Sequence, residues 1–133
     1  MKHLTAAIGA ALALAVQAAP LAAPAATVSL TSLAPAHIGV ASSSQSCEKA
    51  ASLNGSPYFV KPTITDEQGI VGIARVRIDL TQTGELTRES IYASSGNHWL
   101  DEAALTSARM SRFTPELADC KPVAGSYLYS VEF

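Results

Sequence analysis

Four polar side chains that could do chemistry together lie within one short stretch, at Ser94, Ser95, His98 and Asp101. Hydroxyl, imidazole and carboxylate are the groups of a hydrolytic triad, and His98 and Asp101 can approach each other at i,i+3 on a helix. No glycine elbow exposes either serine, and both serines stand where the start of a helix needs capping groups. We therefore predict no enzyme, with Asp101 accepting backbone amides or facing the loop, and a small secreted hydrolase remains as the third alternative.

The two cysteines, Cys47 and Cys120, form one even pair. In a chain that reaches an oxidising compartment such a pair predicts a disulfide, and closing so long a loop restricts the unfolded chain by roughly 4 kcal/mol. Two unpaired thiols are the alternative. Neither cysteine has a second Cys or a His at ligand spacing, so we expect no metal and no cofactor.

The beginning of the sequence has the pattern of a secretory signal peptide, which we assign to residues 1–25. Met1-Lys2-His3 supplies a positive charge, Leu4 to Val16 is apolar, and small residues follow. Ala18 and Ala25 each end a stretch that signal peptidase could cleave. The chain is therefore expected to be exported to the periplasm.

An uncleaved membrane anchor is the competing interpretation of the same residues. A helix needs about 20 consecutive apolar residues to cross the hydrocarbon core. This stretch is rich in alanine rather than leucine, and it is interrupted by Gly9, Gln17, Pro20 and Pro24. Contact with a membrane is expected only if the segment is not removed.

The 133 residues have room for one modest hydrophobic core. The formal net charge is -2, and the basic residues are scattered without interleaved aromatic residues, so no nucleic-acid partner is expected. Residues 26–56 are mostly Ser, Ala, Thr and Gly and are predicted to form a flexible tether. The folded domain is predicted over residues 57–133.

The domain should begin with a β-hairpin. An alternating apolar pattern predicts its first strand and consists of Ala74, Val76, Ile78 and Leu80. Gly84 supplies the positive φ that a tight connection needs. The returning strand should begin at Leu86, and because Leu86 and Ile91 have opposite parity, we expect a bulge or bend over residues 88–90.

A helix is predicted to begin after Asn97, whose side chain can cap its first turn, and to run to about Ser111. Its apolar stripe recurs at four-residue spacing and consists of Leu100, Ala104 and Ala108, joined by Ala103 and Leu105. The small residues in this stripe permit close approach to a sheet. Trp99 is expected to cover the rim of the core at the start of the helix.

A last strand is predicted with one face made of Tyr127, Tyr129, Val131 and Phe133. The order hairpin, helix, strand predicts an α+β fold, in which one main helix packs on one face of a three-stranded antiparallel sheet. A right-handed crossover could place the last strand beside the first. We expect the last strand to form an edge of the sheet, where unpaired backbone groups can accept an extended partner segment. The candidate partner-binding residues are Ser126, Leu128, Ser130 and Glu132.

Positions spread over the domain form one combination of motifs: Gly72, Gly84, Ser94, Ser95, Gly96, Leu100, Asp101, Ala104, Phe113 and Pro115. Together they resemble the C-terminal domain of the TonB family, over about residues 62–133. The resemblance implies a periplasmic domain that links inner-membrane energy to outer-membrane receptors. It also implies contact with those receptors partly by strand pairing.

Two features depart from that family. Where the family usually has Tyr-Pro before the first motif glycine, this chain has Lys61-Pro62. An energy transducer also needs an inner-membrane anchor and a long stiff spacer, whereas residues 26–57 are not proline-rich and span at most about 100 Å when fully extended. We therefore expect an exported domain that binds an envelope protein, such as an outer-membrane receptor, by sheet-edge contacts. The alternative is a membrane-anchored TonB-type energy transducer that serves receptor-dependent transport.

Overall fold

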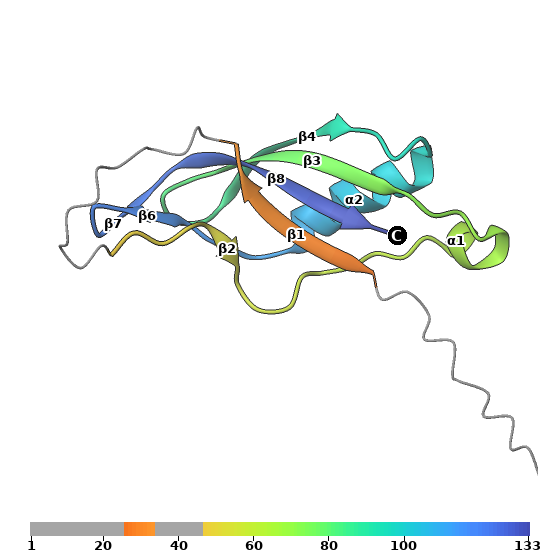
Figure 1. Ribbon diagram of the computed structural model, residues 1–133, viewed down its shortest axis with the longest axis horizontal. Helices are drawn as coiled ribbons and strands as arrows, with labels where there is room; N and C mark the ends of the chain where they lie inside the picture. The colour runs from red at the N-terminus through yellow and green to blue at the C-terminus, as the bar shows by residue number, and fades with distance from the viewer. Residues whose placement is uncertain (1–25, 34–46) are drawn as a thin grey trace, which may run out of the picture.

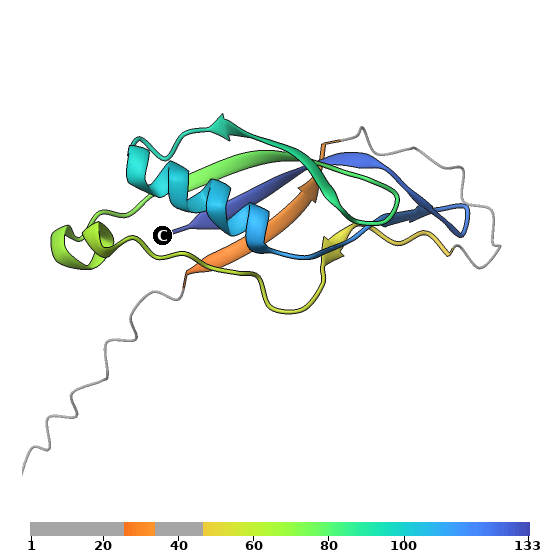
Figure 2. The same ribbon diagram turned by 180° about the vertical axis from the view of Figure 1, so that it is seen from behind.

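The main sheet of the protein has four antiparallel strands, in the order β1-β8-β3-β4. The strands are β1 (Thr27–Ser32), β3 (Ile73–Leu80), β4 (Leu86–Ala93) and β8 (Gly125–Glu132). The computed structural model describes residues 26–33 and 47–133, so the predicted signal peptide lies outside the described residues. Helix α2 (His98–Met110) crosses one face of the sheet (Figures 1 and 2). None of the other described elements covers the opposite face, which we call the open face. The predicted α+β class, with one main helix on an antiparallel sheet, is confirmed.

Shorter elements flank this layer at both ends (Figure 1). They are α1 (Thr63–Gln68), the pair β2 (Ser52–Leu53) and β5 (Phe113–Thr114), and the pair β6 (Glu116–Ala118) and β7 (Lys121–Val123). The turn between β6 and β7 carries Cys120, which forms the predicted disulfide with Cys47 across a Cα–Cα distance of 5.0 Å. The disulfide therefore fastens the segment before β2 to the β6–β7 hairpin.

The core lies between α2 and the inner face of the sheet. The predicted helical stripe faces the sheet, because Leu100, Ala104 and Ala108 are all 0 % exposed. The sheet contributes alternate residues of two strands, namely Ala74, Val76, Ile78, Leu80, Tyr127, Tyr129 and Val131. Because the buried stripe of the helix is largely alanine, the helix can lie close to the two tyrosines.

The sequence predicts three strands, and the fourth, β1, comes from the predicted tether. Residues 26–56 contribute β1, β2 and a bridge between Lys49 and Leu117, so the described parts of this stretch belong to the folded domain. Val28 and Leu30 pack against the core from β1. The tether prediction failed here because six residues with only two aliphatic side chains carry little local signal, and their order comes from pairing with β8.

Strand β8 lies between β3 and β1, so the predicted placement of the last strand beside the first strand of the hairpin is confirmed. The prediction that the last strand forms an edge is wrong, because β1 pairs with its other side. The predicted bulge is present one residue earlier than expected. Asp79 pairs with Arg88 and Leu80 pairs with Leu86, which leaves Thr87 as the extra residue.

Candidate partner-binding surface

The backbone of β8 directs its hydrogen-bonding groups alternately to its two neighbours. Gly72 and Phe133 exchange two backbone hydrogen bonds, of 3.4 and 2.9 Å, in line with the β3–β8 register. On the other side, the amide of Leu33 donates to the carbonyl of Ser126 at 3.0 Å, in line with the β1–β8 register. Because hydrogen-bonded pairs alternate along an antiparallel ladder, odd-numbered residues of β8 bond to β3 and even-numbered residues bond to β1.

The predicted partner-binding residues are those even-numbered positions, Ser126, Leu128, Ser130 and Glu132. Their backbone groups form a pairing edge, and the strand that occupies this edge is the chain's own β1. Their side chains alternate with the buried Tyr127, Tyr129 and Val131, so they lie on the face opposite the core. Figure 2 shows α2 on the core side of the sheet. The structure therefore brings the four residues together and covers their backbone with residues 27–33.

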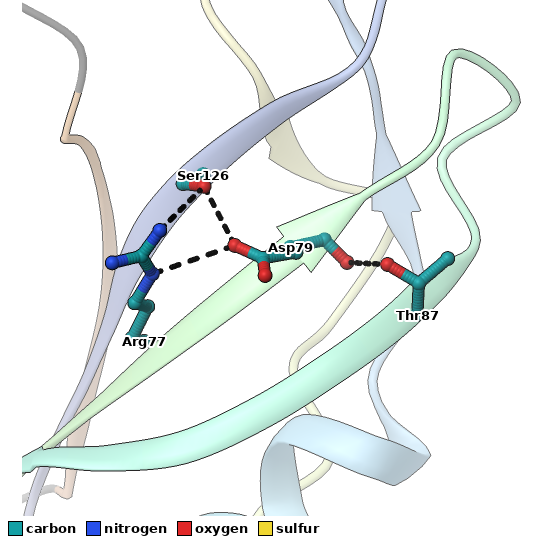
Figure 3. A network of polar contacts seen from close by, with 4 residues as sticks. All are labelled: Arg77, Asp79, Thr87 and Ser126. Atoms are coloured by element: carbon teal, nitrogen blue, oxygen red, sulfur yellow. Dashed lines mark hydrogen bonds and ion pairs between the residues drawn. The ribbon is translucent and has the colours of Figure 1, made fainter.

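Ser126 also takes part in a polar network on the open face (Figure 3). Its hydroxyl donates to Asp79 Oδ1 at 2.6 Å and accepts from Arg77 at 3.3 Å, and Arg77 Nε lies 3.5 Å from the same carboxylate oxygen. Thr87 donates to the Asp79 carbonyl at 3.0 Å, so the bulge residue is held as well. The Ser126 hydrogen bond is the main reason that the pKa of Asp79 lies below its usual value, with burial opposing and Arg77 and Arg88 assisting.

The edge strand β1 is regular and uncharged. It pairs with β8 over six consecutive positions without a register shift. Val28 lies opposite Val131 and Leu30 lies opposite Tyr129 on the inner face, whereas the side chains on the outer face are Ser and Thr. An uncharged, regular edge of this kind is suited to strand pairing.

A hollow of about 560 Å³ lies at the N-terminal end of β1, and we call it the β1 hollow. Its walls are mainly apolar and include Ala26, Val28, Phe59, Ile70, Val71 and Phe133. Lys61 is the charged residue of its lining. The β1 hollow is thus an apolar pocket with one cationic side chain in its lining, and it lies beside the start of β1.

Strand β4, at the other edge, has the opposite character. Its register with β3 shifts twice, near Thr87 and near Tyr92. Arg88 and Glu89 lie between the two shifts, and Arg109 of α2 donates to Glu89 Oε1 at 2.6 Å. Bulges and charges are the features by which natural sheets discourage pairing at an edge.

The Ser94–Asp101 cluster is a cap at the start of α2. Asp101 accepts hydrogen bonds from the Ser94 hydroxyl at 2.6 Å and from the Ser95 amide and hydroxyl at 2.8 Å each. Asn97 accepts from the amides of Trp99 and Leu100, which confirms the predicted N-cap. Both serine hydroxyls donate directly to a carboxylate, and no imidazole stands between them. This arrangement holds the loop after β4 against the helix.

The electrostatics of Asp101 agree with that role. Burial raises the pKa of Asp101. Hydrogen bonds from Ser94 and Ser95 and the nearby His98 lower it by more than burial raises it, so the pKa lies below its ordinary value. A carboxylate held in the charged form accepts hydrogen bonds well and is a poor general base near neutral pH. The cluster therefore suits structural capping better than proton transfer.

The motif glycines explain why distant motif positions occur together. A Cβ on Gly72 would lie 3.1 Å from the Ser95 carbonyl oxygen and 3.3 Å from Leu100 Cδ1. A Cβ on Gly84 would collide with the Phe113 carbonyl and lie 3.1 Å from Pro115 Cδ. Of the remaining motif residues, Gly96 lies in the loop before α2 and Ala104 is fully buried. The motif glycines thus allow two close backbone contacts: Gly72 with Ser95 before the start of α2, and Gly84 with Phe113 after its end.

Trp99 departs from its predicted position over the core, because its side chain is 59 % exposed. Tyr92, near the end of β4, is exposed to a similar degree, at 60 %. Exposed aromatic side chains are common in protein-binding surfaces. Sequence periodicity could not show this, since Trp99 follows the cap where the helical stripe has only begun.

Within the residues that the structure describes, no helix has the length and apolar character needed to cross a membrane. The same residues contain no cluster of three or more His, Cys, Asp or Glu side chains placed to hold a metal ion. What the described fold offers is a small α+β layer with a strand-pairing edge and an adjacent apolar hollow. These features are typical of small domains that bind other proteins.

Residues 58–133 match the family described as Gram-negative bacterial TonB protein C-terminal. The match covers more than half of the chain, so the chain belongs to this family, as its motifs predicted. Membership gives it a TonB-like energy-transducer domain of a kind that interacts with protein partners. Comparison with curated proteins and with solved structures gave no match.

Proposed function

We propose that this chain is an exported periplasmic TonB-like domain that binds an extended segment of an envelope protein along the side of β8 that β1 covers. One observation carries the proposal: Ser126, Leu128, Ser130 and Glu132 direct their backbone groups in an unbroken register to β1, a strand that β8 alone holds in the sheet. An extended segment binds such an edge through main-chain hydrogen bonds, and pockets for alternate side chains supply specificity. The family's interaction with partners supports the same function.

Two features support export. Residues 1–25 have the signal-peptide pattern, and cleavage after Ala18 or Ala25 would release the domain. The Cys47–Cys120 disulfide suits an oxidising compartment such as the periplasm. An outer-membrane receptor or another envelope protein is therefore the expected partner.

The alternative function is a membrane-anchored energy transducer for receptor-dependent transport, which family membership favours. Residues 1–25 would then remain in the inner membrane. Because β1 begins at Thr27, only Ala26 would separate that anchor from the sheet, and the domain would have no spacer while β1 is in place. The intact mass of the protein in periplasmic extract separates the two functions. Loss of the residues up to Ala18 or Ala25 excludes the anchored form, and full mass in the membrane fraction contradicts export.

The binding site is tested by crosslinking capture from periplasmic extract with tagged Leu128→Pro and Leu128→Thr proteins. Proline removes the amide that faces the pairing edge, whereas threonine keeps the amide and a side chain suited to strands. We expect capture to fall about fivefold with proline, since a backbone hydrogen bond contributes about 1 kcal/mol, and to stay near the parent level with threonine. Equal capture by two folded variants would contradict strand pairing at β8.

A further inference from the structure

Strand β1 is attached to the main sheet through a single neighbour, β8. Its two inward side chains, Val28 and Leu30, are only partly buried. The residues opposite them, Val131 and Tyr129, are both 0 % exposed. Departure of β1 would therefore uncover apolar surface on β8, and any strand that replaces it must supply apolar side chains at the same two positions.

The β1 hollow shows where β1 fills its place incompletely. Ala26 and Val28 have the same parity, and both line the hollow with small side chains. Larger apolar side chains at these two positions would fill space that β1 leaves unfilled and would bury more apolar surface against Phe59 and Phe133. A foreign segment can thus fit this edge better than the chain's own residues do.

We propose that β1 is a built-in substitute for the partner's strand, and that the partner binds by replacing β1 on β8. This inference rests on the proposed function and specifies its partner. The partner segment is extended and uncharged, with aliphatic residues at the positions of Val28 and Leu30. It has a larger apolar residue than Ala26 at the position that reaches the β1 hollow. Small polar residues between them face the open side of the sheet, as Ser29 and Thr31 do.

The built-in strand sets a threshold for binding. A strand on the same chain competes at an effective concentration in the millimolar range, so a segment that merely copies β1 binds weakly to the intact protein. A segment that fills the hollow gains contacts that β1 lacks. The competition therefore selects partners that bind better than β1.

The first test uses the full chain with Val28→Asp and Leu30→Asp, which expels β1 by placing charges against the core. The probe is a fluorescent synthetic peptide with the sequence of residues 26–33, measured by anisotropy. We expect it to bind this variant at least tenfold more tightly than the wild-type chain. A peptide with leucine in place of Ala26 should bind about fivefold more tightly still, because the added side chain enters the hollow. A peptide that carries both aspartates is the matched control and should not bind.

Equal peptide affinity for the variant and the wild-type chain would overturn the inference. A second arm keeps the native packing and remains decisive if the double aspartate variant does not fold. Ser29 and Ser130 are paired in the register, and a hydrogen-bonded antiparallel pair has a Cα separation of about 5.5 Å, within the reach of a disulfide. Ser29→Cys/Ser130→Cys locks β1 in place, and Ser29→Ala/Ser130→Ala is the unlocked control.

The locked protein should lose capture of the envelope partner and of the leucine-containing peptide, while the alanine control keeps both. Undiminished capture by the locked protein would overturn replacement of β1 and binding at β8, because the locked β1 occupies that side of β8. It would leave standing only the proposal of a periplasmic domain that binds an envelope protein, at another surface. Peptide binding that follows the predicted order, with no partner captured from extract by any variant, would support replacement and contradict the proposed function. The two failures are therefore distinguishable.

Discussion

The two edges of the sheet are built in different ways. Strand β1 is uncharged, pairs in one unbroken register and contributes two partly buried side chains. Strand β4 has two register shifts, and the charged residues Arg88 and Glu89 lie between them. A tight turn joins β4 to β3. Strand β4 is therefore protected from pairing by its own irregularity, whereas β8 needs another strand to cover it.

The ends of β4 are also held more firmly. Gly84 lets the hairpin turn pack against the segment after α2, and Asp101 holds the loop that follows β4 against the start of α2. Strand β1, by contrast, joins the sheet through β8 alone. Substitutions that break these contacts, and hydrogen exchange of the intact protein, should show how strongly each edge is held.

The largest effect is expected from Gly84→Ala. Gly84 has a φ of 82°, and a Cβ there would collide with the Phe113 carbonyl, so both the backbone strain and the collision oppose the change. We expect a loss of about 3 kcal/mol in the free energy of unfolding, measured by urea denaturation. Gly55→Ala is the matched control, since Gly55 has a similar φ of 85° with nothing within 4 Å, and it should cost about 1 to 2 kcal/mol. Equal losses would show that the collision is relieved without cost.

Asp101→Asn should destabilise the β4 end by about 2 kcal/mol at pH 7, because hydrogen bonds to a charged acceptor are lost. The folded pKa of Asp101 lies below its unfolded value of 3.8, so its contribution is present above that pH and is lost as the pH falls through the folded pKa. The wild-type chain should therefore lose stability below about pH 4, and part of that loss should be absent in the variant. Asp79 contributes a loss of the same sign in both proteins.

Thermal unfolding from pH 7 to pH 2 measures this prediction. Asp119→Asn is the control, because Asp119 is exposed and its positive φ of 50° is one that asparagine tolerates. An Asp101→Asn profile parallel to that of the wild-type chain would show that Asp101 does not cap the helix as a carboxylate.

Native-state hydrogen exchange compares the edges without a mutation. The amides of Ser29 and Thr31, which face β8, should open at a free energy about 1 to 2 kcal/mol below that of global unfolding. The amides of Val76 and Tyr129, which join β3 and β8, should exchange only near the global value. Equal protection of the two groups would mean that β1 leaves the sheet only when the whole domain unfolds.

The smallest change in stability is expected when the charges of β4 are removed. Arg88→Val/Glu89→Val should alter the free energy of unfolding by at most about 1 kcal/mol, since the Glu89–Arg109 pair is partly exposed. The double variant should nevertheless self-associate more than its parent in sedimentation velocity, because its edge becomes apolar. Glu85→Val, just before β4, is the control and should not self-associate. Unchanged sedimentation of the double variant would show that the bulges alone protect β4.

Local sequence signals predicted the elements whose order is local. Alternation in residues 74–80, the Asn97 cap and the four-residue spacing of Leu100, Ala104 and Ala108 each report contacts within one element or one face. The same reasoning could not find the contact between Gly84 and Phe113, because it joins two turns that are remote along the chain. Trp99 was predicted to cover the rim of the core and is instead largely exposed, since periodicity alone does not place residues at the first turn of a helix.

The partner-binding residues show where prediction from sequence ends. Alternation identified Ser126, Leu128, Ser130 and Glu132 as one face of the last strand, and the structure places them on one face. Whether that strand was an edge depended on Thr27–Ser32, a segment with two aliphatic residues in a Ser- and Ala-rich stretch. Val28 and Leu30 alternate there with small polar residues, which is the pattern of a half-buried strand, but the pattern is short and its strand order depends on pairing with β8.

By itself, the sequence determined the α+β class, the helix with its cap, the disulfide partners and the family motifs, because each rests on spacing, parity or the chemistry of particular side chains. Only the tertiary structure decided which strand covers β8. An isolated six-residue strand cannot offset the entropy of its own ordering, so β1 exists only where β8 supplies backbone partners and Val131 and Tyr129 receive Val28 and Leu30.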